Sequence, residues 1–418
     1  MVLGKGSITT MMTDEEAAQL LQQACDSLAV DDKCVLVLIP DGTRTSPLPL
    51  IFRQLYAHLG QRVRQLDYLV ALGTHPPMSA QALSSLLGTP VAEDGRAKQY
   101  SNVRIFNHHW SDPSALQTIG VISRAEAAEL TDGLLADEIP VTLNHHIFEY
   151  DQLIICGPVF PHEVAGFSGG AKYLFPGIAG AEIINFTHWL GALVTSMHTI
   201  GAKETPVRRV IQRAAQFVQV PLYCIALVLR GHDLHGIYCG EEVETWNQAA
   251  DLSGQLNIMH IGKEMRSVLA LPSPMYDDLW TAAKAMYKTE PVIADGGEVI
   301  IYAPHLSEVS YTHGQLIDQI GYHVRDYFTK QWERFKDFPG GVLAHSTHVK
   351  GAGSYDAESG SEYPRIQVTL ATAIPEERCR KINLGYCDYR TIDLQKWQER
   401  EDEGYLFVPH AGEVLYRL

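Results

Sequence analysis

The stretch VLVLIPDG (residues 35–42) decides the fold, because five apolar residues in a row end in a proline–aspartate–glycine loop. An uninterrupted apolar run of this length is typical of a strand that is buried on both faces of a parallel sheet. The runs YLVALGTH (68–75) and LIICGP (153–158) repeat the pattern, and helical patterns at 50–59 and 80–87 lie between them. The sequence therefore predicts an α/β fold with mainly parallel sheets.

Two α/β domains are expected from the length of 418 residues, at roughly 150 residues for each domain. A break near residues 262–275 separates the first alternating region from a second one, which starts with a predicted helix at 277–286 and a strand at 299–303. We therefore predict an N-terminal domain at 1–265 and a C-terminal domain at 266–418. The last ~15 residues are a candidate for packing back on the N-terminal domain.

The composition excludes several classes of protein. Hydrophobic residues make up 46% and charged residues 20%, as in a folded chain rather than a disordered one. With 33 Lys and Arg against 49 Asp and Glu, the net charge is −16, and no basic run offers a site for nucleic acid or an anionic membrane. We expect no signal peptide, because the N-terminus has no long apolar core after a basic start, and no apolar stretch reaches membrane-spanning length. Seven scattered cysteines without a CxxC pair indicate a reducing compartment. We expect a soluble cytoplasmic protein, of open oligomeric state.

Polar loops follow the first two predicted strands. In DGTRTSP (41–47), Arg44 can hold a carboxylate or phosphate with two parallel hydrogen bonds, and Asp41 is alternatively a cap for the next helix. In GTHPP (73–77), two prolines fix the backbone after His75, which suits a base that must be aimed, although a structural histidine is the alternative. Ligand sites of parallel sheets lie beyond the carboxyl ends of the strands, where these residues and His162 fall.

The most informative segment is FPHEVAGFSGGAKYLFPGIAGAEIINFTH (160–188). Its Ser168-Gly169-Gly170 turn can present backbone N–H groups to a phosphate, but the complete phosphate-loop spacing is absent because Tyr173 follows Lys172. A helix is predicted at 181–197, with His188 in its interior. Taken one at a time, such a histidine is more often packed or exposed than functional, and such a lysine is more often solvated.

Together, DGTR (41–44), GTH (73–75) and the block from His162 to His188 resemble the nickel-dependent lactate racemase family, most strongly over residues 30–200. The resemblance implies a nickel-pincer nucleotide as the cofactor and an active site in the cleft between the two domains. It also implies that the enzymes that make this cofactor are partners of this protein. Protein from a host that lacks those enzymes is expected to carry an unmodified Lys172.

The resemblance also implies a role for each matching residue. Lys172 corresponds to the lysine that tethers the cofactor through a thioamide. His188 corresponds to the histidine that ligates nickel beside two sulfurs and a carbon, a donor set that suits Ni(II). His75 and His162 correspond to two acid/base histidines. The expected cofactor contacts are completed by Asp41, Thr43, Ser168, Gly169 and Gly170, and the expected substrate contacts are Arg44, Lys284 and Thr281.

The C-terminal half departs from the family pattern. Family members have a Gln and a Lys three residues apart that hold the substrate carboxylate, and Lys284 corresponds to the Lys, whereas Thr281 stands in the place of the Gln. This departure argues against lactate as the substrate. Residues 345–350 (HSTHVK) offer polar groups that a methyl substituent could not use, so a sugar acid or another polyhydroxy acid is the expected substrate; a surface loop is the alternative.

The sequence thus predicts a racemase or epimerase that inverts C2 of a 2-hydroxy acid by hydride transfer to the cofactor. A protein that binds or stores the nickel nucleotide without turnover is the alternative from another class. A metal hydrolase ranks last, because no compact ligand motif such as H-E-x-x-H is present. The paired histidines at 108–109 and 145–146 are expected to be structural or loop residues.

Overall fold

The computed structural model describes residues 2–100 and 102–418. Its chain forms two compact units, each assembled from three stretches. Unit 1 comprises Met1–Phe160, Phe167–Ile184 and Arg208–Leu256, and unit 2 comprises Pro161–Gly166, Asn185–Val207 and Asn257–Leu418. The chain thus passes several times from one unit to the other, and a single domain boundary at residue 265 stays a prediction.

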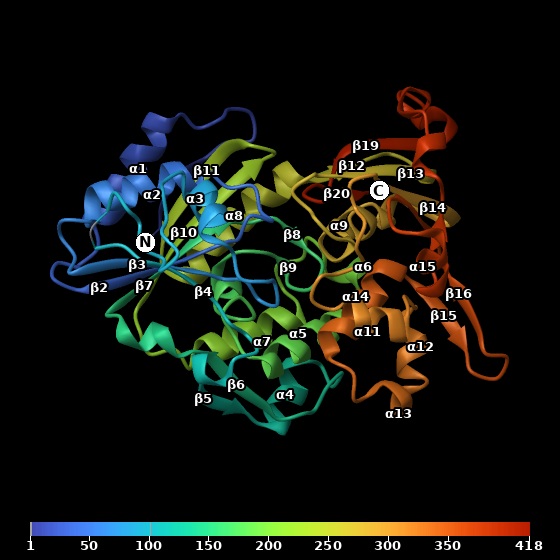
Figure 1. Cartoon of the computed structure of the whole chain (residues 1–418), viewed down its shortest axis with the longest axis horizontal. Coiled ribbons are helices and arrows are strands. Elements are labelled where there is room, and N and C mark those ends of the chain that lie inside the picture. Colours follow the sequence, from blue (N-terminus) through green and yellow to red (C-terminus); the bar gives the residue numbers. More distant parts are fainter. Residues whose placement is uncertain (1, 101) are drawn as a thin grey trace. The chain divides into compact units, whose positions relative to one another are not determined.

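Unit 1 is built on a seven-stranded sheet (Figure 1). The strands β10, β7, β2, β3 and β4 are parallel, and only β1 and β11 at one edge run antiparallel to their neighbours. In sheet order the strands are β1 (Leu3–Gly6), β11 (Asp233–Gly240), β10 (Leu222–Arg230), β7 (Gln152–Pro158), β2 (Cys34–Ile39), β3 (Gln65–Val70) and β4 (Ile105–Asn107). The α/β class with a mainly parallel sheet is confirmed.

The apolar run that predicted β2 is buried on both faces of this sheet. Successive side chains of a strand point to opposite faces. Val35 and Val37 pack in one core cluster with Phe52 and Leu55, whereas Leu36, which points the other way, is also fully buried. Covering both faces removes the need for an alternating polar pattern, which explains the continuous apolar run.

Helices α1, α2 and α3 contribute to that core cluster. The predicted helix at 80–87 is confirmed, and Ser79 caps it by accepting a hydrogen bond from Ala82 N–H. The predicted helix at 50–59 is also present and begins two residues earlier. Unit 1 contains α1 (Asp14–Asp26), α2 (Leu48–Leu59), α3 (Ala80–Leu87), α4 (Arg124–Leu130) and the small antiparallel pair β5 (Leu116–Ile122) and β6 (Ile139–Asn144); α7 (Pro206–Ala215) and α8 (Glu242–Asn257) lie mostly within it.

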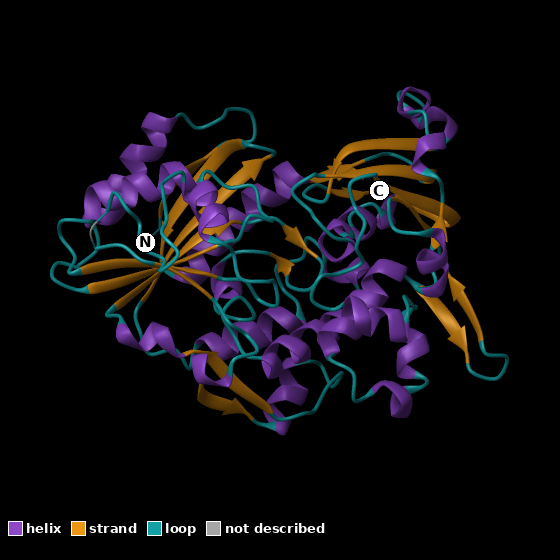
Figure 2. Ribbon diagram, viewed as in Figure 1, coloured by secondary structure: helices purple, strands orange, loops and turns teal. Residues whose placement is uncertain are grey.

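Unit 2 contains a second sheet, of five strands that are all parallel (orange arrows in Figure 2). Its order is β18 (Gly385–Tyr386), β17 (Gln367–Thr372), β14 (Ile293–Ala303), β13 (Met265–Pro272) and β19 (Tyr405–Ala411). The strand predicted at 299–303 is the second half of β14. The last strand, β20 (Leu415–Arg417), pairs with β12 (Ile258–His260), and both belong to unit 2.

Two predicted helices are shorter than expected. The helix predicted at 181–197 ends as α5 (Ala181–Val194), because Thr195 takes a left-handed conformation (φ 79°) before α6 (Ser196–Thr199) begins. The helix predicted at 277–286 is two short helices, α9 (Leu279–Ala282) and α10 (Lys284–Tyr287). The first begins only after Asp278, whose carboxylate accepts a hydrogen bond from Thr281 N–H and caps it.

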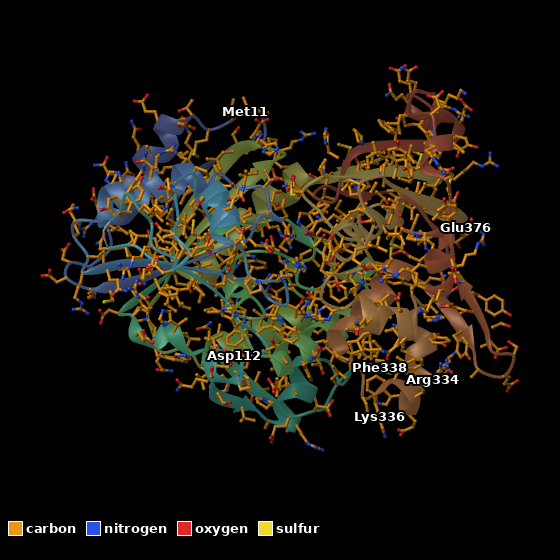
Figure 3. All side chains as sticks on the ribbon, in the orientation of Figure 1. Met11, Asp112, Arg334, Lys336, Phe338 and Glu376 are labelled. Atoms are coloured by element: carbon orange, nitrogen blue, oxygen red, sulfur yellow. The ribbon has the colours of Figure 1, made fainter. Side chains whose placement is uncertain are left out.

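The remaining helices and strands are mostly short. They are α11 (Gly314–Ile320), α12 (Arg325–Thr329), α13 (Trp332–Phe335), α14 (Gly340–Lys350), α15 (Glu376–Lys381), β8 (Pro161–His162), β9 (Gly166–Phe167), β15 (Gly353–Asp356) and β16 (Ser361–Pro364). The exposed side chains of Lys336 and Glu376 lie near the edge of the view in Figure 3. Within the described residues, no helix has both the length and the apolar character that crossing a membrane requires.

Candidate active site

A first group of candidate site residues lies in unit 1, at the carboxyl ends of two neighbouring strands. Because β2 and β3 are parallel and adjacent, the loops that follow them meet at one edge of the sheet. Asp41 follows β2 and His75 follows β3, and Nδ1 of the histidine lies 2.5 Å from Oδ2 of the carboxylate. A carboxylate only accepts, so the neutral imidazole donates its Nδ1–H and carries a lone pair on Nε2. The ring is 27% exposed and can therefore exchange a proton with a ligand.

The charge of Asp41 is strongly favoured although the residue is buried. Burial opposes ionisation, but the charges of His75 and Arg44 and hydrogen bonds from His75 and Thr43 lower the pKa of Asp41 well below its usual range. Thr43 donates from both its backbone N–H and its hydroxyl to Oδ1, at 3.0 and 2.6 Å. Asp41 is thus a fixed anion that orients His75. It does not cap α2, because the N-cap residue of that helix is Pro47.

The Ser168-Gly169-Gly170 turn packs tightly against the chain's own groups. The Ser168 hydroxyl donates to Pro158 O (3.0 Å) and accepts from Phe160 N–H (2.9 Å). Both glycines have positive φ, and a Cβ on Gly170 would lie 2.3 Å from Glu242 Oε1. That carboxylate accepts the Ala171 N–H. A phosphate contact at this turn stays a prediction, since these groups already serve the fold.

The same turn holds Lys172 in a rigid backbone. Lys172 lies in a 3-10 turn (Gly170–Tyr173), and its carbonyl accepts a hydrogen bond from Gly177 N–H at 3.0 Å. Ala171 and Tyr173 on either side are buried, whereas Lys172 is half-buried. Tyr173 lies close enough to Asp41 and Arg44 for their charges to affect its phenol. The lysine is therefore presented from a fixed turn near the Asp41 group.

A second group of candidate site residues lies in unit 2 and centres on His162. Its Nδ1 accepts hydrogen bonds from Val164 N–H (3.1 Å) and Ala165 N–H (3.4 Å). A nitrogen that accepts carries no proton, so the neutral ring has its proton on Nε2, opposite to the assignment for His75. Hydrogen bonding thus gives the two histidines different roles at Nε2: His75 accepts there and His162 donates there.

Glu163 adds a buried negative charge to this part of the site. Its Oε2 lies 3.5 Å from His162 Nδ1. Burial disfavours the anion, but the charge of His162, a backbone hydrogen bond and the charges of Lys284 and His348 lower the pKa of Glu163 well below its usual range. Side chains from three separate segments of unit 2 therefore surround one carboxylate.

His188 is half-buried on α5, and its electrostatic influence reaches His348 on α14. Among the described residues, no group of three or more His, Cys, Asp or Glu side chains is arranged to hold a metal ion. The metal-hydrolase alternative therefore finds no such ligand group there. A metal ion that brings donors from its own cofactor needs a single protein ligand, and one accessible imidazole fits that requirement.

Lys284 and Thr281 lie three residues apart and are both buried. The Lys284 ammonium lies 4.5 Å from the centre of the Tyr276 ring. The Thr281 hydroxyl donates to Asp278, 3.0 Å from Oδ1 and 3.2 Å from the carbonyl. Because that hydrogen already serves the helix cap, Thr281 can offer a ligand only an oxygen lone pair, unlike the amide donor of a Gln.

A model of the lactate racemase N-terminal domain matches residues 15–201, the span that holds the Asp41–His75 pair, His162, Lys172 and His188. Residues 15–201 belong to the lactate racemase family. The chain is 23% identical over 291 residues to the lactate racemase of Thermoanaerobacterium thermosaccharolyticum. The aligned region covers 66% of this chain and 61% of that relative. It is 24% identical over 294 residues to that of Lactiplantibacillus plantarum, covering 66% and 62%. The matches thus span less than two thirds of those relatives.

Solved structures extend the likeness to the whole chain. A crystal structure of a protein from Thermotoga maritima is 31% identical, covers 99% of both chains and superposes with a TM-score of 0.90. The lactate racemase apoprotein of T. thermosaccharolyticum superposes with a TM-score of 0.71 at 17% identity, covering 98% of this chain and 94% of that one. This second likeness shows that the lactate racemase fold includes the C-terminal half.

The structure groups the predicted site residues within each of the two units. In unit 1 it brings Asp41, Thr43 and Arg44 together with His75. In unit 2, electrostatic contacts join His162 and Lys284 to Glu163. Sequence reasoning missed Glu163, although a carboxylate directly after a candidate acid/base histidine was a readable signal.

Proposed function

We propose that this protein is a racemase or epimerase that inverts C2 of a 2-hydroxy acid with a nickel-pincer nucleotide. The observation that carries the proposal is the Asp41–His75 pair, in which a buried anion aims a partly exposed imidazole at the carboxyl edge of the sheet. A protein that only stores a nucleotide has no need of an oriented base.

The residues present fit the proposed cofactor. Lys172 supplies a primary amine for a covalent tether from a fixed turn, and His188 supplies the single protein ligand for nickel. When bound, the cofactor would supply a hydride acceptor for C2 of the substrate. Ser168, Gly169 and Gly170 are proposed to contribute to the nucleotide site through the backbone of their turn.

The chain's own residues move the protons. The lone pair at Nε2 of His75 can take the hydroxyl proton of one enantiomer, and Asp41 then faces the resulting imidazolium. His162 donates at Nε2, so it is proposed to supply the proton on the opposite side of the substrate, and Glu163 lies 3.5 Å from its Nδ1. Two acid/base groups are needed because the two enantiomers present their hydroxyl groups on opposite sides of one hydride acceptor. Arg44 and Lys284 are proposed to hold the substrate carboxylate.

The mass of intact protein tests the tether. Wild-type protein made together with the family's cofactor-making enzymes should carry a covalent adduct, and Lys172→Ala should carry none. Lys33→Ala, which changes an exposed lysine, is the matched control and should keep the adduct. An adduct on Lys172→Ala, or none on the wild type, would contradict the assignment.

Turnover separates the proposed function from its alternative. The adduct-bearing protein should interconvert the C2 epimers of at least one member of a panel of 2-hydroxy acids, followed by chiral chromatography. His75→Ala and His162→Ala should each lower the rate by about 10²- to 10⁴-fold, the usual contribution of general acid/base catalysis. A full adduct without turnover of any acid would instead identify a protein that holds the cofactor.

A further inference from the structure

Helix α14 (Gly340–Lys350) in unit 2 has polar residues on two different faces. Ser346 and Lys350 are four residues apart and lie on one face, whereas His345 and His348 are three apart and lie on another. The helix is buried from Val342 to Val349, so polar groups on either face need partners. The sequence alone left open whether this stretch was a surface loop, and the structure excludes that alternative.

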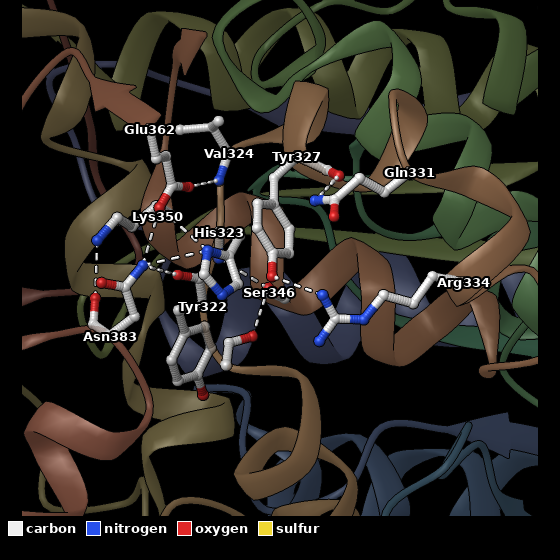
Figure 4. Close-up of polar contacts among 11 residues, drawn as sticks. Tyr322, His323, Val324, Tyr327, Gln331, Arg334, Ser346, Lys350, Glu362 and Asn383 are labelled. Atoms are coloured by element: carbon white, nitrogen blue, oxygen red, sulfur yellow. Dashed lines mark hydrogen bonds and ion pairs between the residues drawn. The ribbon is translucent and has the colours of Figure 1, made fainter. Parts of the chain in front are cut away.

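The first face serves the fold (Figure 4). The Ser346 hydroxyl donates to Gly321 O (2.8 Å) and accepts from His323 N–H (3.0 Å). The Lys350 ammonium donates to Asn383 O at 2.7 Å. Glu362, which accepts from Val324 N–H and contacts His323, completes the same network. The polar atoms of this face are used up by the protein itself.

The second face carries two ring nitrogens for which the described residues provide no hydrogen-bond partner. The His345 ring stacks on Trp280 at 3.9 Å, and its Nε2 lies 3.0 Å from the Trp280 carbonyl, so Nε2 carries the proton and Nδ1 is an acceptor. His345 Nδ1 and His348 Nε2 are both buried, and neither has a hydrogen-bond partner within residues 2–100 and 102–418. The side chains of His345 and His348 are only 7% and 4% exposed.

The second face lies near the residues of unit 2 that are proposed to take part in the reaction. Glu163 is electrostatically coupled to His345 and to His348, and His348 is also coupled to His188. The start of α14 is held against α5, because Gly341 N–H donates to Asn185 Oδ1 at 3.0 Å. A Cβ on Gly340 would lie 2.5 Å from Asn185 O, so a close approach of the two helices is built into the sequence.

We propose that His345 and His348 are specificity-determining residues that hydrogen-bond to substrate hydroxyl groups beyond C2, so that the substrate class is the polyhydroxy acids. The proposal rests on the proposed function, whose substrate class it names. Burial lowers the pKa of His345 to about 3, so this ring is neutral near pH 7. A neutral ring suits a hydroxyl group, which both donates and accepts.

The methyl group of lactate could satisfy neither nitrogen. A site that holds buried polar groups rejects a ligand that leaves them unpaired, and this rejection is stronger than that of an apolar pocket toward an ill-fitting apolar group. An apolar site would favour leucine or phenylalanine at these positions. The hydroxyl groups of a four- to six-carbon aldonic acid would provide a donor for His345 Nδ1 and a second group for His348 Nε2.

The test compares D-gluconate with lactate. Binding to the full-length protein is measured by calorimetry, and kcat/KM is measured on the cofactor-loaded protein. The wild type should bind gluconate more tightly than lactate and should convert it with a higher kcat/KM. His345→Leu and His348→Leu should each lower affinity and kcat/KM for gluconate about tenfold, the typical value of one hydrogen bond, and should not lower them for lactate, which leaves the same nitrogens unpaired. His348→Gln, which keeps a donor and an acceptor, should retain part of the preference.

Ser346→Ala is the control from the other face of α14; it should lower the melting temperature and leave the gluconate-to-lactate ratio unchanged. His348→Leu should not lower the melting temperature, whereas a purely structural histidine would. Equal use of lactate and gluconate by the wild type, or equal losses for both acids in the histidine variants, would overturn the inference. If no 2-hydroxy acid is converted but gluconate binding still depends on His345 and His348, the proposed function fails and the recognition stands.

Discussion

The carboxylate of Asp41 fixes both the direction and the tautomer of His75, and an amide could not do both equally well. Asp41→Asn keeps the shape but removes the anion that faces the imidazolium, so the turnover number should fall by about 10²-fold or more. Asp67→Asn is the matched control: Asp67 is also buried, accepts from Arg104 N–H and the Tyr150 hydroxyl, and lies outside the site. It should lower stability and spare turnover; steady-state kinetics that show Asp41→Asn unimpaired would contradict the role of Asp41.

His108 shows the opposite use of a histidine. Its Nε2 donates to Ala179 O (2.9 Å), its Nδ1 accepts from Asn144 Nδ2 (3.1 Å), and burial lowers its pKa to about 4. The structural interpretation of this residue is confirmed. Because its folded pKa lies below the ordinary 6.5, its stabilising effect is complete above pH 6.5 and is lost as the pH falls toward 4.

His108→Gln keeps a donor for Ala179 but cannot be protonated. Between pH 7 and pH 4, the free energy of unfolding of the wild type should therefore fall by about 3 kcal/mol more than that of the variant. Urea denaturation at both pH values measures this difference. Parallel pH profiles for the two proteins would show that His108 is not held neutral by the fold.

At the scale of elements, apolar runs located the central strands, and buried polar residues shifted their ends. The second strand, predicted from Tyr68 onward, is β3 (Gln65–Val70) and includes Asp67. A charged residue looks like a boundary in the sequence, but here its carboxylate is satisfied by Arg104 N–H and the Tyr150 hydroxyl. The strand could be predicted from the sequence alone, whereas its exact start depends on tertiary partners.

The sequence of helix α14 shows no helical period of apolar and polar residues. The reason is that the helix is buried on all sides and carries polar residues on two faces. The period of an amphipathic helix arises from one wet face, and this helix has none. The candidate site residues of unit 1 were better predicted, since Asp41 and His75 each follow an apolar strand directly. The direction of a side chain such as His348 depends on the packing of distant segments and could not be predicted.

The turn before Lys172 offers a test at the level of an element. Gly170 (φ 59°) combines a left-handed conformation with close contact to Glu242 and Trp246, whereas Gly231 (φ 57°) shares the conformation but has no atom within 4 Å of a Cβ. Gly231→Ala should cost about 1 kcal/mol of unfolding free energy from backbone strain alone. Gly170→Ala should cost at least about 2 kcal/mol and also lower the yield of the Lys172 adduct. Equal losses in denaturation experiments would mean that close packing of this turn is unimportant.

On the scale of the whole molecule, the chemistry-bearing segments come from distant parts of the sequence, while the two sheets supply the frame. In unit 1, β2 and β3 present the Asp41–His75 pair. In unit 2, α14 brings His348 close to Glu163, nearly two hundred residues earlier in the chain. The family motifs therefore indicate the shared chemistry, and we propose that residues outside them determine which substrate this chain recognises.

The cysteines provide a test of packing throughout the chain. Six of the seven are buried, and only Cys387 is partly exposed. Burial raises the pKa of Cys25 and of Cys156 to about 12, so their reactive thiolate forms are negligible at neutral pH. Native protein treated with iodoacetamide should therefore gain one adduct by intact mass, and protein in denaturant should gain seven. Cys387→Ser should gain none in the native state. Rapid native labelling at several sites would show that the apolar cores of these sheets open far more readily than their burial implies.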